Sequence, residues 1–345
     1  MIEIDGSHGE GGGQILRMAV ALSAMTRTDV RIENIRAGRP NPGLAAQHVA
    51  AVRTVAALAS ARVEGLEVGS KAIRFEPGEI VAGRQALDVG TAGSVTLVLQ
   101  ACLPVAFRAP GPVQLRLVGG TDVRWSPPTD YVSRVFLPLL RRCGGEADLI
   151  LHRRGYYPRG GGSIEVLVRP AAGWSPLTVT DPGPVLAVRG IAHVSNLPPE
   201  IPKRIKHAAM RRLHGHGEPK IEERVYAGDE AVGQGGALVL WAETEHAVLG
   251  SSSLAERGKP SERVGEEAAA ALVADLDSGA TVDPHAADQI LIYLAQSREP
   301  SAFLVREVTD HLRTMAWLIP QFLDCDVSIE THNGLWRVVV DAKAA

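Results

Sequence analysis

One histidine in the sequence is placed where it could act as a nucleophile. His311 stands in VTDHLRTM, two residues after Thr309, which can cap the start of a helix. The positive end of the helix dipole disfavours a protonated ring there, and a neutral imidazole is a competent nucleophile at neutral pH. Asp310 could orient the ring or simply favour the helix start. The alternative is an ordinary packing or capping role for His311.

Four glycines stand close together near the start of the chain, in GEGGGQILR, from Gly9 to Arg17. The stretch lacks the Lys-Ser/Thr ending of a phosphate-binding P-loop and the spacing of a dinucleotide fingerprint. Gly11 to Gly13 would still let an anion approach the free N–H groups of the following helix. Glu10 could hold a cation such as Mg2+ between phosphate oxygens. The alternative is a tight turn between a strand and a helix, with Glu10 in solvent.

Three arginines offer planar donors suited to phosphate. Arg36 and Arg39 stand in a Gly/Pro-rich loop, IRAGRPNPGLAAQH, ahead of a helix that contains Gln47. Together with Arg17 they could bind phosphate oxygens in a bidentate manner. Ordinary surface arginines are the alternative.

The elements that must position these side chains repeat along the chain. Three stretches each show the pattern helix, strand, helix and two strands, and they begin at GQILRMAV, AGSVTLVLQ and DQILIYLAQ. Between the second and third copies lies a segment that breaks the period. The sequence predicts an α/β (α+β) fold, with a large domain of three repeated α/β units (1–184 and 278–345) and a small inserted α+β domain (185–277). Because every candidate site residue lies outside the insert, we expect its role to be peripheral.

Composition limits the classes of partner. The chain has 345 residues, a formal net charge of −3 and 4% aromatic residues. These values argue against a large sequence-independent nucleic-acid surface and against an extended base-stacking platform, but they leave room for a small site for one strand end. The three cysteines, Cys102, Cys143 and Cys325, suggest neither a disulfide framework nor a thiolate metal site.

The cysteine usage fits a reducing cytoplasm. The first residues carry acids where a signal peptide would carry cations, and no apolar run approaches the length that a membrane span needs. We therefore expect a soluble cytoplasmic protein with no membrane partner. The sequence does not indicate an oligomeric state.

Several motifs, taken together, resemble the RNA 3′-terminal phosphate cyclase family over nearly the whole chain. The most specific is RGYYPRGGGSI, from Arg154 to Ile164, which contains a second glycine triplet. DGSHGEGGGQILR, IRAGRPNPGLAAQH, GTAGSVTLVLQ, GGTDVRWSPP and ADQ ahead of HLRT match the family in the same order. The family's architecture, three repeated α/β units with a small insert, is also what the period of the sequence indicates.

The resemblance implies ATP-dependent conversion of an RNA 3′-phosphate to a 2′,3′-cyclic phosphodiester, a ligase-type nucleotidyl transfer. By motif position His311 carries AMP, and Glu10 falls where the family places its divalent metal, Mg2+ or Mn2+. The positions matching the ATP-binding segments are Gln100, His285, Ala286, Ala287, Asp288 and Gln289. The positions associated with the phosphate or the RNA end are Arg17, Arg36, Arg39 and Gln47. On this interpretation the two glycine clusters let two phosphate-bearing ligands approach the backbone around one histidine.

Two positions depart from the family's pattern. Met315 stands where asparagine is more usual, and His285 where tyrosine is more usual; the ring of His285 could still stack on adenine. One alternative function is a non-catalytic relative that acts in ribosomal-RNA processing or assembly, although such a scaffold need not keep His311. A more distant alternative is an enolpyruvyl-transferase type of enzyme, which needs no histidine nucleophile and lacks the cyclase signature.

Overall fold

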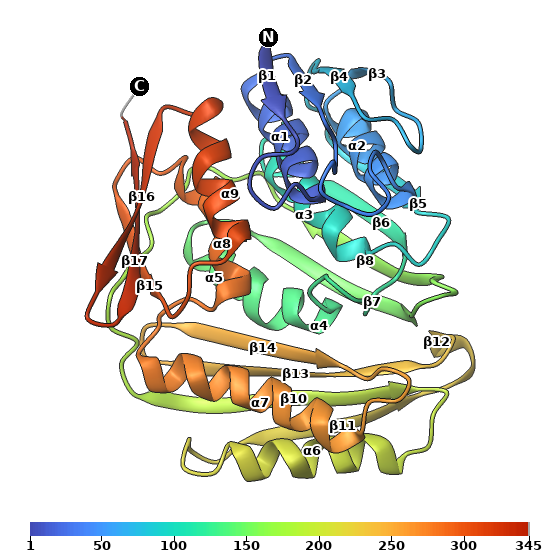
Figure 1. The fold of residues 1–345 in the computed structure, drawn as a ribbon, viewed down its shortest axis with the longest axis vertical. Helices are drawn as coiled ribbons and strands as arrows, with labels where there is room; N and C mark the ends of the chain where they lie inside the picture. The colour runs from blue at the N-terminus through green and yellow to red at the C-terminus, as the bar shows by residue number, and fades with distance from the viewer. Residues whose placement is uncertain (344–345) are drawn as a thin grey trace.

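The computed structural model describes residues 1–343. Its strands form four sheets. Figure 1 shows three of them in the upper body around a group of helices, and the fourth across the bottom of the view. This mixture of sheets and helices confirms the predicted α/β class. No helix within residues 1–343 is long and apolar enough to cross a membrane.

Three of the sheets share one strand order, which confirms the three repeated units. The first sheet, in the order β1-β2-β4-β3, consists of β1 (Ile2–Asp5), β2 (Val30–Glu33), β3 (Arg62–Glu64) and β4 (Ile73–Glu76). The second unit contributes, in the order β5-β6-β8-β7, the strands β5 (Gly83–Asp88), β6 (Val113–Gly119), β7 (Ala147–Gly155) and β8 (Gly162–Val168). The third sheet, in the order β9-β15-β17-β16, consists of β9 (Thr178–Val179), β15 (Ser301–Val305), β16 (Cys325–His332) and β17 (Leu335–Ala342).

Each unit begins with a strand that the sequence pattern does not reveal. β1, β5 and β9 pair in parallel with the next strand of their unit, whereas the last two strands of each unit pair antiparallel. A parallel pair needs a crossover, and a helix supplies it in each case. β1 has four residues and β9 has two, too few to establish an alternating pattern.

The helices of the three units pack on one another between the sheets (Figure 1). Those longer than one turn are α1 (Gly13–Thr26), α2 (Ala46–Leu58), α3 (Val95–Ala106), α5 (Leu137–Arg142), α8 (Pro284–Leu294) and α9 (Asp310–Leu318). The single helix expected before β7 is divided into α4 (Thr129–Tyr131), a π-helical turn (Val132–Phe136) and α5. Ser94, Asp283 and Thr309 cap α3, α8 and α9 with side-chain oxygens, as such residues commonly do.

The predicted insert contains the fourth sheet and a hydrophobic core of its own. The sheet has the order β11-β10-β13-β14 and consists of β10 (Val185–Ser195), β11 (Lys220–Tyr226), β13 (Gly235–Thr244) and β14 (Val248–Leu254). Helices α6 (Glu200–Arg212) and α7 (Ser261–Ser278) pack against each other and against this sheet. Val188, Leu238 and Leu272 are among the buried residues of that core.

The insert is also joined to the main body. β12 (Ala231–Val232) follows a short 3-10 turn (Gly228–Glu230) and pairs in parallel with Arg154 and Gly155 of β7. Three buried insert residues, Ile191, Val239 and Trp241, belong to the core of the main body. Helix α7 runs to Ser278, one residue past the expected boundary. The division into 1–184, 185–277 and 278–345 stays a prediction.

Candidate active site

His311 lies at the first turn of α9, against the glycine-rich start of α1. Thr309 accepts a hydrogen bond from the Leu312 N–H at 3.1 Å, so the expected cap is present. The His311 side chain is 50% exposed, and its Nδ1 lies 2.7 Å from Glu10 Oε2 and 3.0 Å from Gln14 Oε1. The ring is therefore held by residues of the first unit. Of the two roles considered for Asp310, its place in the first turn of α9 fits the one that favours the helix start.

Glu10 also contacts a cation. Its Oε1 forms an ion pair with Nη2 of Arg39, while Oε2 faces His311. A side chain at Gly12 would crowd this pair, because an added Cβ would lie 2.5 Å from Glu10 Oε1 and 3.0 Å from Arg39 Nη2. One glycine of the first cluster is thus needed for the close approach of Glu10 and Arg39.

A buried chain of polar groups continues from His311 through Gln14. Gln14 Nε2 donates a hydrogen bond to Oδ2 of Asp288, a residue of α8, at 2.5 Å. Burial raises the pKa of Asp288 to about 6, and His311, His285 and Arg17 oppose the rise. The family resemblance places Asp288 near a nucleotide. It does not point to Gln14, because local sequence patterns do not show which distant residues come into contact.

Arg17 is a buried cation with an unused donor. Burial lowers the pKa of its guanidinium to about 10, while Asp288 acts in the opposite direction. Its Nε has no hydrogen-bond partner among residues 1–343. Buried donors in folded proteins are nearly always paired, so an unpaired one beside the glycine cluster suits an anionic ligand.

His48 is a site neighbour that the sequence analysis misses. Its Nδ1 accepts a hydrogen bond from the Ala45 N–H at 3.1 Å, and a Cβ on Gly13 would collide with its Nε2. Burial, together with Arg17 and Arg36, lowers the pKa of His48 to about 3. A neutral ring whose Nδ1 accepts must carry its proton on Nε2, which points towards the start of α1.

Arg36 and Gln47 have partners away from His311. Arg36 Nη1 donates to the Gly43 carbonyl at 2.7 Å, and burial lowers the pKa of Arg36. Gln47 Oε1 accepts from the Ser94 N–H at 3.4 Å and so reaches the loop ahead of α3. These two residues shape the loops around the site, and no hydrogen bond among the described residues joins either of them to His311.

The segment expected to bind ATP opens helix α8. Asp283 accepts from the N–H groups of His285 and Ala286 at 3.0 and 3.1 Å, so this helix start is firmly capped. His285 is exposed, and its ring meets the Tyr131 ring edge-on at a centroid distance of 6.1 Å. Ala286 and Ala287 are fully buried, so their side chains pack inside the protein.

The two glutamines named with this segment differ in their surroundings. Gln289 is buried, and its Nε2 donates to the carbonyl of His285 within α8. Gln100 is half-buried in α3. Of the expected ATP-binding residues, Asp288 alone is joined to His311 by hydrogen bonds, through Gln14.

The second glycine cluster serves packing. A Cβ on Gly160 would lie 2.6 Å from the Thr91 carbonyl oxygen, and one on Gly162 would lie 2.5 Å from the Gly155 nitrogen. The cluster therefore lets three loops meet, because backbone of the same chain fills the space in which side chains would lie. Since the chain's own backbone lies against the second cluster, the first glycine cluster is the candidate for binding phosphate.

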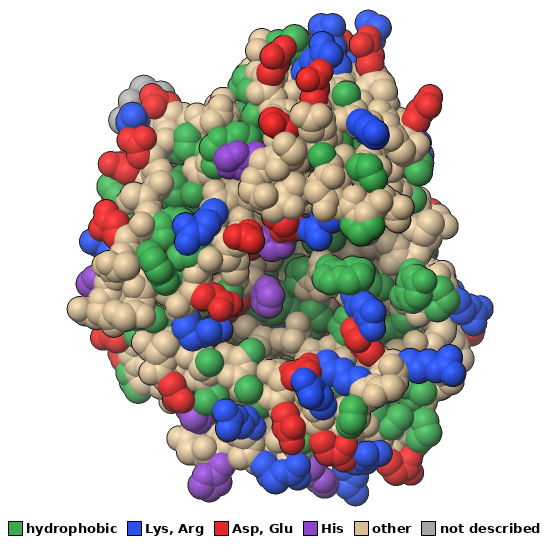
Figure 2. Space-filling model, in the orientation of Figure 1, with side chains coloured by type: hydrophobic (Ala, Val, Ile, Leu, Met, Phe, Trp, Pro, Cys, Tyr) green, Lys and Arg blue, Asp and Glu red, His purple; other side chains and the backbone are tan. Residues whose placement is uncertain are grey.

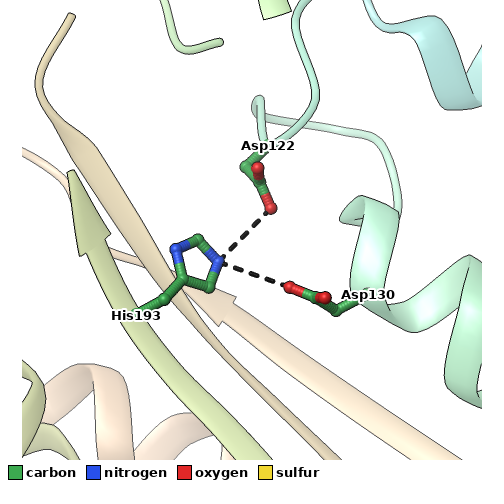
Figure 3. Close-up of side chains that lie close together, drawn as sticks. All are labelled: Asp122, Asp130 and His193. Carbon is green, nitrogen blue, oxygen red and sulfur yellow. Dashed lines mark ion pairs between the residues drawn. The ribbon is translucent and has the colours of Figure 1, made fainter. Parts of the chain in front are cut away.

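Arg154, at the start of this second cluster, lies in a buried ion network. Its guanidinium contacts Asp122 at 3.1 Å and Asp130 at 2.6 Å, and His193 of β10 faces the same two carboxylates (Figure 3). Burial raises the pKa of Asp122, but Arg154 and His193 outweigh it and hold that pKa below its usual range.

Asp122, Asp130 and His193 form the one group within residues 1–343 whose ligand atoms are close enough for a metal ion. Arg154 already neutralises the two carboxylates, so a cation would have to displace a buried guanidinium. The cluster is better explained as an ion network that joins the insert to the second unit.

The surface above these elements is hollowed. Figure 2 shows a depression near the centre of the face, bordered by histidine, acidic and basic side chains, in the part of the view around which Figure 1 shows α1, α4, α8 and α9. A half-exposed imidazole beside a carboxylate, with buried and exposed arginines, can transfer a phosphoryl or nucleotidyl group.

Comparison with known proteins identifies the family. The model of a family described as RNA 3′-terminal phosphate cyclase matches residues 8–329, a range that includes every candidate site residue. A protein named RNA 3′-terminal phosphate cyclase from Nitrosospira multiformis is 48% identical over 338 residues, covering 98% of this chain and 96% of that protein. A protein of the same name from Methanopyrus kandleri is 47% identical, covering 97% of this chain and 96% of that protein. Another, from Hyperthermus butylicus, is 50% identical, covering 86% of this chain and 84% of that protein. The chain belongs to the RNA 3′-terminal phosphate cyclase family.

Proposed function

We propose that this protein uses ATP to convert a phosphate at the 3′ end of RNA into a 2′,3′-cyclic phosphodiester, with AMP carried on His311. The observation that carries the proposal is the orientation of one ring: His311 Nδ1 faces Glu10 Oε2 at 2.7 Å and Gln14 Oε1 at 3.0 Å. The names of the relatives supply the RNA 3′-phosphate as the substrate class.

Asp288 and Gln14 determine which nitrogen of His311 reacts. An ionised carboxylate only accepts hydrogen bonds, so the NH2 group of Gln14 faces Asp288 and its Oε1 faces His311. Since Glu10 is an acceptor as well, Nδ1 carries the proton of the neutral ring. Nε2 then keeps the lone pair that a nucleophile needs.

The reaction has three transfers. Nε2 of His311 attacks the α-phosphorus of ATP; a P–N bond forms, the α–β P–O bond breaks and pyrophosphate leaves. An oxygen of the RNA 3′-phosphate attacks the same phosphorus, and the P–N electron pair returns to Nε2. The adjacent 2′-hydroxyl then gives its proton to water and attacks the 3′-phosphorus; a P–O bond forms, the P–O bond that joins the 3′-phosphate to AMP breaks, and AMP leaves as the ring closes.

Adenylylation makes the last step feasible. A terminal phosphate monoester repels nucleophiles and has only oxide to expel, whereas the adenylylated end can release AMP. The 2′-hydroxyl and the activated phosphorus belong to one ribose, so closure has the advantage of an intramolecular reaction. Arg17 and Arg39 would stabilise the charge that develops on the phosphates during each transfer.

Glu10 is the residue that would hold Mg2+ or Mn2+. Mg2+ sites often use one or two carboxylates and complete the shell with substrate phosphates and water. Both oxygens of Glu10 have partners, so a metal would have to displace the guanidinium of Arg39 from Oε1. Arg39 is 42% exposed, unlike the buried Arg154, so this displacement buries no unpaired charge, and the remaining ligands would come from ATP. A bound metal would neutralise phosphate charge in this place.

The experiment compares two RNA oligonucleotides that end in a 3′-phosphate, one with a terminal ribose and one with a terminal 2′-deoxyribose. After a single turnover with ATP and Mg2+, the products are resolved by gel and by mass. The ribose end should give a cyclic phosphate and free AMP. The deoxyribose end should accept AMP and accumulate in the adenylylated form, because activation does not need the missing hydroxyl.

Joined strands would instead indicate a ligase acting between two ends, and release of inorganic phosphate would indicate a phosphatase. If neither substrate reacts although RNA binds, the protein is a non-catalytic binding member of the family.

A further inference from the structure

Two aromatic side chains stand in solvent with no cover from the rest of the chain. Trp125 is 91% exposed and Tyr157 is 80% exposed, and every other Trp, Tyr and Phe within residues 1–343 is buried or half-buried. Trp125 also has a φ of 61°, a left-handed conformation that is unfavourable for a bulky residue. Exposure and backbone strain together indicate that Trp125 is kept for a contact with something other than this chain.

The loops that carry the two rings begin side by side. The Thr121 N–H donates to the Gly155 carbonyl at 2.8 Å, and the Gly155 N–H donates to Thr121 Oγ1 at 3.0 Å. Trp125 follows Thr121 by four residues and Tyr157 follows Gly155 by two. The rings therefore belong to one loop surface, although they come from different parts of the second unit.

This surface is continuous with the candidate active site. The Ser94 N–H donates a hydrogen bond to Gln47 Oε1 at 3.4 Å, and Ser94 forms a parallel bridge with Gly120. Gly160, in the loop of Tyr157, packs against the Thr91 backbone of the same loop as Ser94. Hydrogen bonds and packing thus lead from Gln47 to both aromatic loops.

Basic side chains accompany the rings. Arg124 precedes Trp125 and is fixed by two hydrogen bonds to Glu256 of the insert, at 2.7 and 2.5 Å. Arg153 is exposed and uses Nε to bind the Gly161 carbonyl at 2.9 Å, while Arg159 is exposed near Tyr157. Exposed aromatics next to cations are the combination with which proteins bind single-stranded nucleic acid.

We propose that Trp125 and Tyr157 stack on the bases of the nucleotides that precede the 3′ terminus of the RNA. The inference rests on the proposed function, because it assumes that the 3′-phosphate lies near Gln47 and His311. Every base presents an aromatic face, so this contact favours longer RNA over a single nucleotide without selecting a sequence. Two rings make a small site and not an extended platform, in keeping with the low aromatic content and the net charge of −3.

The test measures binding of a 5′-fluorescein hexanucleotide with a 3′-phosphate to the full chain, by fluorescence anisotropy. The variants are Trp125→Ala, Trp125→Phe, Tyr157→Ala and Leu186→Ala, the last an exposed apolar residue of β10 and the control. Each alanine variant at an aromatic position should weaken binding about five- to a hundredfold. Trp125→Phe should retain most of the affinity, and Leu186→Ala should match the parent.

A second readout separates this inference from the proposed function. Labelling of the protein by ATP in the absence of RNA should be the same in all four variants and the parent, because stacking acts only on RNA. If the parent does not label, the proposed function fails, while the anisotropy series still tests the aromatic surface. Equal hexanucleotide affinity in the parent, Trp125→Ala and Tyr157→Ala would overturn the inference.

Discussion

At the scale of single residues, His311 could be predicted but its partners could not. Thr309 and the helix pattern predict the start of α9, and the structure confirms the cap. The ring meets Gln14, 297 residues away in the sequence, because the first and third units pack together. Local patterns hold no information on such a contact: near His311 they offer only Asp310, whereas the carboxylate that contacts the ring is Glu10.

Substitutions at Glu10 and Asp310 compare the effects of these two carboxylates on the reaction of His311. We expect Glu10→Ala to slow formation of the AMP adduct about ten- to a thousandfold, because the variant loses the acceptor and the negative charge beside Nδ1. Glu10→Gln keeps an acceptor and should lie between Glu10→Ala and the parent. Asp310→Ala is the matched control and should change the rate little. Single-turnover labelling with ATP measures all three, and an Asp310→Ala variant as slow as Glu10→Ala would contradict this assignment.

Asp288 predicts a pH dependence of stability. Burial raises its pKa from the ordinary value of 3.8 to about 6, so between about pH 4 and 6 the folded state binds more protons than the unfolded state. The contribution of Asp288 to the free energy of unfolding therefore falls as the pH rises through this window. Asp288→Asn cannot ionise, so its stability relative to the parent should increase from pH 4 to pH 7, by at most about 3 kcal/mol.

Urea unfolding of both proteins at several pH values between 4 and 7 measures that difference. Asp275, whose pKa is also about 6, is present in both proteins and cancels in the comparison. A stability difference that stays constant with pH would show that Asp288 does not titrate in this range.

At the scale of elements, the repeat could be predicted but the connections between its copies could not. Glycine, cap and periodicity signals locate α1, α3, α8 and α9. β1 and β9 could not be predicted because they have too few residues to show an alternating pattern. β5 has six residues, but its apolar residues, Ala86 and Leu87, are adjacent and do not alternate, so only its parallel pairing with β6 identifies it. The start of α8 illustrates the same limit: Asp283 accepts from Tyr131 Oη at 2.6 Å and from the Gly250 N–H at 3.0 Å, in addition to capping its own helix.

Asp283→Ala should destabilise the protein by about 2 to 4 kcal/mol, because it removes a cap and leaves buried donors unpaired. It should also raise KM for ATP more than it lowers kcat, since the helix start that it fixes is the expected ATP-binding segment. Ser94→Ala, which removes the cap of α3, is the control and should cost about 1 kcal/mol. Urea unfolding and steady-state kinetics measure both effects. An unchanged KM in a folded Asp283→Ala variant would separate the cap from nucleotide binding.

At the scale of the whole molecule, the insert is more than an appendage. It donates the Gly250 N–H to Asp283, it places His193 against the Arg154 network, and it buries Trp241 in the core of the main body. The sequence suggests a peripheral role because no candidate residue lies within 185–277. The structure shows that backbone and core residues of the insert support the elements of the site, and no motif signals contacts of that kind.

We therefore expect the insert and the body to unfold together. Calorimetry should show one transition whose calorimetric and van't Hoff enthalpies agree. Replacing residues 185–277 by a short Gly/Ser bridge should give a chain that unfolds at a much lower temperature or does not fold, because Asp283 and the Arg154 network lose partners. Two resolved transitions in the parent, or an excision variant as stable as the parent, would show that the insert is independent.

The central claim is that His311 carries AMP, and one measurement tests it most directly. The protein is incubated with α-32P-labelled ATP and Mg2+ without RNA, denatured and digested, and the labelled peptide is sequenced by mass spectrometry. We predict one AMP per chain, in a phosphoramidate bond that is labile to acid, on His311, and no label in a His311→Ala variant whose melting temperature matches the parent. A label on another residue, or an unlabelled parent that still cyclises RNA ends, would contradict the claim.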